Sequence, residues 1–120
     1  MIKFIQTNSE KPFVTFFDCY KKAQAMNQRG IEAISISSYS KELDEVSSRF
    51  VNLKFINNDE FIFFSNYNSP KSIEFQGHSQ ISALIYWNSI NVQIRLKANI
   101  KKTSKQFNHD YFLNRSEEKN

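Results

Sequence analysis

Apolar residues recur at helical spacing near the start of the chain. Pro12 suits the first turn of a helix, because its fixed φ matches helical geometry and its missing N–H is not needed there. The residues that follow at helical intervals are Phe13, Phe16, Phe17, Tyr20 and Ala23. This pattern predicts a helix from Pro12 to about Met26, with Gly30 as the cap of its carboxyl end. Residues 1–11 are predicted to be a polar lead-in.

From Ile31 onward apolar and polar residues alternate, which is the period of a β-strand. Residues 31–37 place Ile34 and Ile36 on one side, and residues 38–45 are predicted to form a polar turn. Residues 46–56 form the next strand, with Arg49, Val51, Leu53 and Phe55 on one face and Phe50, Asn52 and Lys54 on the other. Residues 57–60 are a predicted turn, and residues 60–66 are the partner strand of a hairpin.

The second half of the chain adds two strands between two predicted helices. Residues 69–77 are predicted to be a short helix, because Ser69 can cap it and Pro70 suits its first turn. Residues 79–87 and 91–100 alternate as strands around a tight Asn88-Ser89 connection. The second of them directs Val92, Ile94, Leu96, Ala98 and Ile100 inward, and Gln93, Arg95, Lys97 and Asn99 outward. Residues 104–115 are predicted to be a helix, with Phe107, Tyr111 and Arg115 on one face.

The order of these elements predicts the fold class. Successive strands joined by short turns favour antiparallel pairing, so we expect a mainly β protein with flanking helices, in which about five strands curl into a sheet or small barrel. The 120 residues suffice for one domain, residues 1–120, and are too few for two ordinary ones.

Composition and charge narrow the function classes only slightly. A net charge of +4 is compatible with anionic partners, but no run of five basic residues appears, so a basic nucleic-acid binder is the alternative rather than the main hypothesis. Cys19 stands alone and is expected to be a buried structural thiol. His78 and His109 lack a recognisable ligand spacing, so no metal site is expected. The absence of a long apolar run predicts a cytoplasmic protein without a membrane span.

Three cations lie within a segment that otherwise favours burial. Arg49, Lys54 and Lys71, together with the hydroxyls of Ser65 and Ser69, can supply the donors that hold a phosphate. The alternative is that these cations are ordinary solvated charges. Since Arg49 and Lys54 differ by an odd number, a regular strand directs them to opposite faces, and a shared site requires a bulge or a strand end that wraps round its ligand.

Four segments in this order resemble the pyridoxamine 5'-phosphate oxidase family. They are RFVNLK at 49–54, FIFFSNYNSPKS at 61–72, LIYWNSINVQIRLKANI at 84–100 and YFLNR at 111–115. The resemblance covers roughly Pro12 to Arg115. It implies an antiparallel split β-barrel that binds FMN and works as a homodimer with the flavin at the subunit interface. The implied reaction oxidises pyridoxamine or pyridoxine 5'-phosphate to pyridoxal 5'-phosphate, with oxygen as electron acceptor.

The resemblance also implies residue roles, although it assigns no catalytic residue. The positions that match FMN contacts are Arg49, Phe50, Val51, Asn52, Leu53, Lys54, Phe64, Ser65, Lys71 and Gln93. The positions that match contacts to the phosphate of a small phosphorylated substrate are Lys54, Tyr111 and Arg115. Tyr111 and Arg115 share a predicted helix face, where they offer a hydroxyl and a planar cationic fork to a phosphate.

The chain departs from the family pattern at three places. Pro70 stands where the family often has Arg, and Lys119 stands where it has a Ser that helps to bind substrate phosphate. The family also continues beyond the position of Asn120, with strands that carry a flavin-contacting Trp and an Arg-x-His motif. Two hypotheses follow: the chain is a fragment of a longer enzyme, or it is a shortened relative that binds flavin without this oxidase activity or acts on another small substrate.

Overall fold

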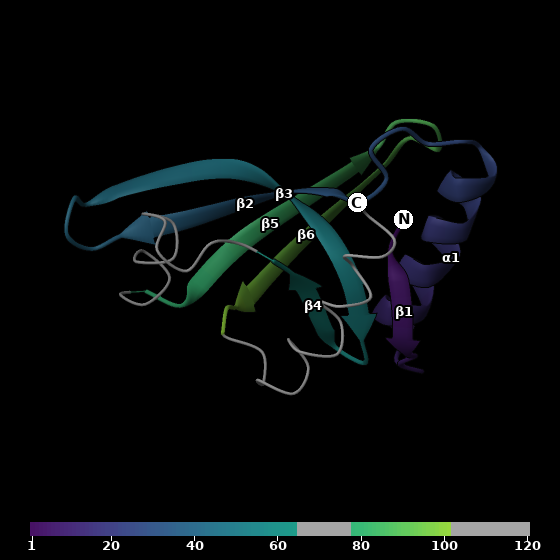
Figure 1. Ribbon diagram of the computed structural model, residues 1–120, viewed down its shortest axis with the longest axis horizontal. Coiled ribbons are helices and arrows are strands. Elements are labelled where there is room, and N and C mark those ends of the chain that lie inside the picture. Colours follow the sequence, from purple (N-terminus) through teal and green to yellow (C-terminus); the bar gives the residue numbers. More distant parts are fainter. Residues whose placement is uncertain (65–77, 102–120) are drawn as a thin grey trace.

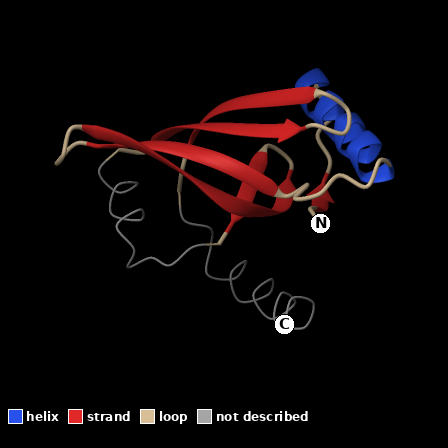
Figure 2. Cartoon of the chain, turned by 90° about the horizontal axis from the view of Figure 1, so that it is seen from above, coloured by secondary structure: helices blue, strands red, loops and turns tan. Residues whose placement is uncertain are grey.

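The computed structural model describes residues 1–64 and 78–101. In this part of the chain the strands form one mixed six-stranded sheet, and one long helix covers an end of that sheet (Figures 1 and 2). The elements are β1 (Lys3–Gln6), α1 (Lys11–Ala25), β2 (Ala33–Ser40), β3 (Glu45–Asn57), β4 (Glu60–Phe63), β5 (Gln80–Trp87) and β6 (Val92–Asn99). The strand order is β1-β3-β2-β5-β6, and β4 pairs with β3. Within the described residues no pairing joins β6 back to β1 or β4, so this sheet is open.

The predicted first helix is confirmed, but its cap is not the predicted one. Pro12 lies in the first turn of α1, and the buried face carries Phe16, Tyr20 and Ala23. The helix ends at Ala25 with Met26 as its cap, and Asn27 then adopts a left-handed φ of 57°. Gly30 also has a positive φ, of 59°, but its carbonyl accepts a hydrogen bond from the N–H of Ala33 and so belongs to the turn that leads into β2. The side chain of Asn tolerates the left-handed region well enough to end a helix without glycine.

The first eleven residues are not a polar lead-in, because β1 pairs in parallel with β3. Ile2 is only 3% exposed and belongs to the core. The hydroxyl of Tyr20 accepts a hydrogen bond from the Ile2 N–H at 3.0 Å and lies 3.4 Å from the Ile2 carbonyl oxygen, to which it donates. The prediction failed because four residues of strand hold their place through contacts with α1 and β3, which lie far away in the sequence.

Strands β2 and β3 form a hairpin longer than the sequence predicted. β2 continues to Ser40 and β3 begins at Glu45, so part of the predicted turn is strand. β5 pairs with β2 only from Ser35 to Ser37, and beyond that point the two hairpin strands pair only with each other in the described structure. The hairpin therefore projects from the sheet, at the left of Figure 1.

The second half of β3 contains an irregularity at Lys54. Leu53 pairs with Phe63 of β4 and Phe55 pairs with Ile62, so Lys54 is an additional residue on the β3 side. Such an insertion is a β-bulge, which bends a strand and changes the phase of its side chains. Leu53 and Ile56 both belong to the core as a result, although three positions separate them and a regular strand would direct them to opposite faces. The bulge that a shared site for Arg49 and Lys54 requires is thus present in this strand.

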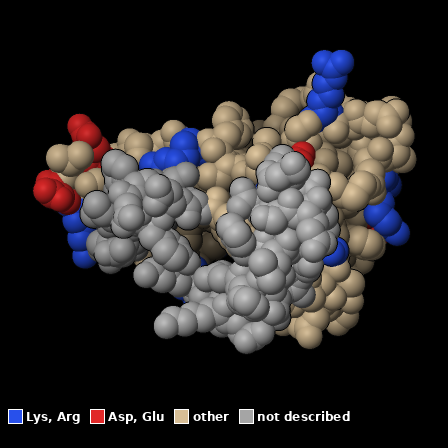
Figure 3. Space-filling model, viewed as in Figure 1, with Lys and Arg blue, Asp and Glu red and all other residues tan. Residues whose placement is uncertain are grey.

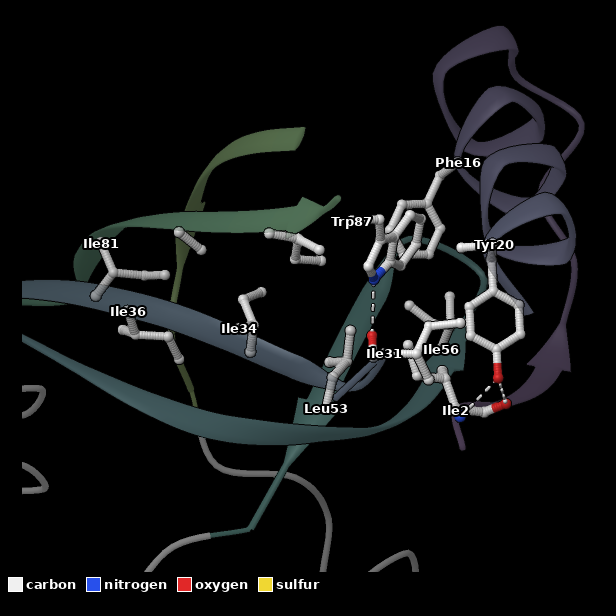
Figure 4. Packing of buried hydrophobic residues seen from close by; sticks show 13 residues of the cluster. Ile2, Phe16, Tyr20, Ile31, Ile34, Ile36, Leu53, Ile56, Ile81 and Trp87 are labelled. Carbon is white, nitrogen blue, oxygen red and sulfur yellow. Dashed lines mark hydrogen bonds between the residues drawn. The ribbon is translucent and has the colours of Figure 1, made fainter. Parts of the chain in front are cut away.

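The core lies between α1 and the inner face of the sheet (Figure 4). Trp87 is completely buried, and its indole N–H donates a 2.9 Å hydrogen bond to the carbonyl of Ile31. The rings of Phe16 and Tyr20 contact Trp87, with centroid distances of 5.5 and 5.9 Å. Cys19 was expected to be buried, but it is only half-buried where it packs against this core.

The last two strands confirm the predicted hairpin and most of its orientation. Trp87 pairs with Val92, and the outward residues of β6 are exposed as predicted. Ala98 pairs with buried Ile81 on the inner face, but it is itself exposed. The predicted helices 69–77 and 104–115 lie outside the described residues. In the part of the chain that is described, no helix is long and apolar enough to cross a membrane.

Removal of the Tyr20 hydroxyl is expected to destabilise the fold. Tyr20→Phe leaves the N–H and carbonyl of buried Ile2 without this partner, at a cost of about 1–3 kcal/mol in the free energy of unfolding. Urea unfolding measures this difference. Tyr39→Phe is the matched control, because that hydroxyl donates to Asp44 in an exposed contact. Equal losses for the two variants would contradict the proposed anchoring of β1.

Candidate functional site

The register of the sheet divides the predicted site residues between two faces. Arg49 pairs with Ile36, whose side chain is buried in the core, and the alternation of β3 places Val51 and Leu53 on this same inner face. Phe50 and Asn52 therefore lie on the outer face. Gln93 is outward as well, because its cross-strand partner Tyr86 is exposed between the buried Ile85 and Trp87.

Rows of side chains cross the outer face from β3 to β6. One row consists of Phe50, Ser35, Leu84 and Arg95, which pair in succession across four strands. The neighbouring row consists of Ser48, Ser37, Ser82 and Lys97. The inner strands of the sheet thus contribute mainly small hydroxyl side chains, while the ring of Phe50 and the cations of β6 stand at the two sides. Such a face can receive a flat molecule or another protein surface.

Large apolar side chains on this outer face are exposed. Phe50 is 75% exposed, Tyr86 57% and Leu84 39%. The sequence reasoning identified Phe50 and Gln93 but missed Tyr86 and Leu84. The sequence did contain a signal for these two residues. Leu84 and Tyr86 alternate with Ile85 and Trp87 along β5, so the two pairs must lie on opposite faces of the sheet. Exposed apolar residues that gather on one face often mark an interface or a binding site.

Arg49 lies among hydroxyl groups on the inner face. Its Nη2 donates a 2.7 Å hydrogen bond to Ser47 Oγ, and both Nη1 and Nη2 lie 3.3 Å from Ser38 Oγ. Ser38 is only 2% exposed. These contacts hold the guanidinium at the base of the projecting part of the hairpin, where it combines a fixed positive charge with neighbouring hydroxyl donors.

Lys54 lies at the bulge, next to a carboxylate that the sequence reasoning did not consider. The carbonyl of Glu32 accepts a 2.7 Å hydrogen bond from the N–H of Leu53, which fixes Glu32 beside the bulge. Its carboxylate accepts a 2.9 Å hydrogen bond from the amino group of Met1. That hydrogen bond is the main cause that holds the pKa of Glu32 below its ordinary value, and the positive charge of Lys54 also favours the ionised form. Glu32 therefore places a negative charge close to a predicted phosphate ligand.

The other predicted site residues divide between described and undescribed parts of the chain. Phe64 is half-buried, and its ring meets that of Phe55 edge to face with centroids 6.1 Å apart. Ser65, Lys71, Tyr111 and Arg115 lie outside the described residues. The structure therefore describes the six predicted positions on β3, together with Phe64 and Gln93, but not the full predicted set.

Charges in the described part of the chain do not form a continuous basic surface in the view of Figure 3. Acidic side chains gather at the tip of the β2–β3 hairpin, which carries Glu42, Asp44 and Glu45, and the blue Lys and Arg groups are separated by uncharged surface. The described residues contain no group of three or more His, Cys, Asp or Glu that could hold a metal ion. His78 instead packs its ring edge against Tyr39, with centroids 5.4 Å apart.

Comparison with known proteins gives a consistent result. The pyridoxine/pyridoxamine 5'-phosphate oxidase of Colwellia psychrerythraea is 39% identical over 92 residues, which are 74% of this chain and 42% of that protein. Pyridoxine/pyridoxamine 5'-phosphate oxidase 1 of Hydrogenovibrio crunogenus is 31% identical over 87% of this chain and 48% of its own length. The chain spans about half the length of the curated relatives it matches. No protein-family model matches it.

Two solved structures share the fold. PhzG from Burkholderia lata, in complex with tetrahydrophenazine-1-carboxylic acid, superposes with a TM-score of 0.80 at 20% identity and covers 88% of this chain and 52% of its own. A pyridoxamine 5'-phosphate oxidase-related, FMN binding protein from Nostoc punctiforme superposes with a TM-score of 0.71 at 12% identity, covering 93% of this chain and 60% of its own. These matches confirm the predicted split-barrel fold class.

Glu32 is expected to make the free energy of unfolding depend on pH in the acidic range. Its pKa is lowered in the folded protein, so the stability that its ionised form contributes is present above the ordinary value of 4.5 and is lost as the pH falls through the lower folded pKa. Urea midpoints of the wild type should therefore fall more steeply than those of Glu32→Gln below pH 4.5. Glu42→Gln, an exposed change in the hairpin turn, should follow the wild type. Parallel curves for the wild type and Glu32→Gln would contradict this role.

Proposed function

We propose that this chain, which belongs to the pyridoxamine 5'-phosphate oxidase family, is an FMN-dependent oxidase that converts pyridoxamine or pyridoxine 5'-phosphate to pyridoxal 5'-phosphate in the cytoplasm. Oxygen is the proposed electron acceptor. The similarity to curated oxidases supports the reaction, and the observation on which the proposed site rests is the register that places Phe50, Asn52 and Gln93 on one exposed face.

The outer face fits the flat part of a flavin. Ser35 and Ser82 are small, so a planar ring system can approach the sheet between the side chains of Phe50 and β6. The exposed amide of Gln93 offers both a donor and an acceptor to the polar edge of the ring. The chemistry that FMN supplies when bound is acceptance of a hydride from substrate and transfer of electrons to oxygen. The protein residues bind and orient the reactants.

The phosphate of FMN is assigned to the cations of the β3 region and the segment after β4. Arg49 offers a planar fork of N–H donors, and Ser47 and Ser38 already hold that fork in one place. Lys71 and Ser65 are proposed partners from the undescribed segment. A charge-assisted contact of this kind contributes about 1.5–3 kcal/mol to binding.

The opposite orientations of Arg49 and Gln93 favour a flavin held between two copies of the chain. Within one copy the two side chains lie on different faces of the sheet, so a single ligand on the outer face does not meet both directly. In a homodimer one copy can supply Gln93 and the other Arg49. The exposed Phe50, Tyr86 and Leu84 provide apolar surface that such a dimer buries.

Substrate phosphate is assigned to Lys54, Tyr111 and Arg115. Lys54 is half-buried at the bulge and supplies the positive charge for this phosphate. The carboxylate of Glu32 lies nearby and carries a negative charge. Tyr111 and Arg115 are proposed to complete the grip with a hydroxyl and a guanidinium. This assignment separates the cation set for the substrate from Arg49, which is proposed for the cofactor.

A second candidate function is flavin binding without this oxidase activity, or oxidation of another small substrate. The observation that favours it is the similarity to PhzG, whose solved complex contains tetrahydrophenazine-1-carboxylic acid rather than a pyridoxine phosphate. Tight FMN binding without formation of pyridoxal 5'-phosphate or peroxide from pyridoxamine 5'-phosphate would favour this candidate. The assay requires the longest natural form of the protein.

FMN titration followed by fluorescence tests the cofactor site. Arg49→Ala and Gln93→Ala should each weaken FMN binding, and loss of the charge-assisted contact of Arg49 should raise Kd about tenfold or more. Arg29→Ala is the matched control, because Arg29 is exposed in the loop after α1 and has no proposed role. Unchanged affinity in Arg49→Ala, with thermal unfolding like that of the wild type, would count against the proposed phosphate contact.

Mixing these two variants tests whether the site spans two copies. If Arg49 and Gln93 come from different subunits, a heterodimer of Arg49→Ala with Gln93→Ala contains one intact site and one doubly altered site. Random reassociation of equal amounts should then restore wild-type affinity to roughly a quarter of the sites. If both residues come from the same subunit, mixing restores no sites. Light scattering of the wild type checks that a dimer is present.

A further inference from the structure

A groove lies between β1 and the amino-terminal half of α1. None of the residues that line it belongs to the proposed flavin site. Its volume is about 290 Å³. Phe4, Phe16 and Phe17 line its apolar part, and Asn8 and Asn58 are among the polar residues that line it. The rings of Phe4 and Phe17 meet edge to face, with centroids 4.7 Å apart. The lining therefore combines aromatic surface with amide groups.

Hydrogen bonds hold the polar side of the groove in place. The N–H of Asn58 donates to the carbonyl of Gln6 at 2.8 Å, which joins the β3–β4 turn to the end of β1. Asn8 Nδ2 donates to Asn58 Oδ1 at 2.7 Å, and Asn8 Oδ1 accepts from the N–H of Glu10 at 2.8 Å. Residues 50 positions apart thus meet at this edge of the groove. Each Asn amide can form further hydrogen bonds besides these, so the two side chains can also hydrogen-bond with a ligand.

The lining specifies the charge and size of a ligand. It contains six apolar side chains and five uncharged polar ones, and no Asp, Glu, Lys, Arg or His. A charged group that enters would lose hydration without gaining an ionic partner, which disfavours an ion. A cavity of about 150 Å³ holds a benzene molecule. A groove of about 290 Å³ therefore has room for one aromatic ring with a short polar substituent, or for a small bicyclic system.

We propose that this groove is a binding site for a small, uncharged aromatic molecule that carries an amide or hydroxyl group. The aromatic ring packs against Phe4 and Phe17, and the polar group hydrogen-bonds with the amides of Asn8 and Asn58. This site is separate from the outer face of the sheet, and it does not depend on the proposed oxidase function.

Benzamide is a suitable probe, because it is neutral and joins one ring to one amide. Titration into the isotopically labelled full chain, followed by amide NMR, should give saturable shifts at β1, the first turns of α1 and the β3–β4 turn. A dissociation constant on the order of millimolar is expected for a ligand of this size. Benzoate, which has a similar shape and a negative charge, should bind at least about tenfold more weakly. Absence of saturable shifts, shifts confined to other residues, or equal binding of benzoate would overturn the proposal.

A pair of helix variants tests whether the shifts come from the groove itself. Val14 lines the groove and is 42% exposed, so Val14→Trp should fill part of the space and weaken benzamide binding about tenfold or more. Thr15 is exposed on the same helix and does not line the groove, so Thr15→Trp should retain wild-type affinity. Equal affinity in both variants would place the benzamide elsewhere and contradict the site. The NMR titration of the wild-type chain does not depend on either variant. It therefore tests the proposal even if Val14→Trp does not fold.

Discussion

The structure depends on the continuity of one strand. β3 pairs with β2 along its first half and with β1 and β4 along its second half, so both parts of the sheet share it. The additional residue at Lys54 lies between these halves. A bulge bends a strand and shifts its side-chain alternation, which lets β3 serve two partner sets in succession. A regular strand of the same length would direct Leu53 and Ile56 to opposite faces, whereas both belong to the core here.

Aromatic packing attaches the helix to this frame. Trp87 ends β5 and is fully buried, while Phe16 and Tyr20 reach it from α1 (Figure 4). The ring of Tyr20 also lies 5.2 Å from that of Phe4 in β1, centroid to centroid. The Tyr20 hydroxyl and the Trp87 indole both satisfy backbone groups, at Ile2 and Ile31. The cluster thus provides apolar burial and hydrogen bonds at the same place, which positions β1 and the start of β2 relative to the helix.

The two faces of the sheet have different roles, because the inner face packs in the core and the outer face is exposed. Its inner face carries the isoleucines of β2 and β5 and the hydroxyl contacts of Arg49, while its outer face carries exposed aromatic residues, small serines and cations. A protein that binds a planar cofactor needs a surface that is accessible but already shaped, because flexible groups lose entropy on binding. A β-sheet meets this need, since its pleat fixes the direction of every second side chain. The proposed flavin site and the groove beside α1 therefore occupy different surfaces of one rigid frame.

Local sequence patterns determined the helix, five of the six strands and the face of most side chains. The period of β3 placed Phe50 opposite Arg49, and the alternation of β6 placed Gln93 outward, because these directions follow from backbone geometry between near neighbours. The four quoted segments also identified the family, which the comparisons confirm. Part of the predicted site, at Ser65, Lys71, Tyr111 and Arg115, lies outside the described residues and stays a prediction.

Tertiary structure alone decided the features that depend on distant partners. β1 is a strand because its backbone pairs with β3 and Tyr20 holds the preceding residue, Ile2, and nothing within residues 1–11 specifies those partners. Asn27 ends α1 in place of Gly30, since the chain must turn there to reach β2. The position of Glu32 beside Lys54 and the meeting of Asn8 with Asn58 likewise arise from strand pairing. The sequence determines what each residue can do locally, but contacts between residues far apart in the chain form only when the whole sheet has assembled.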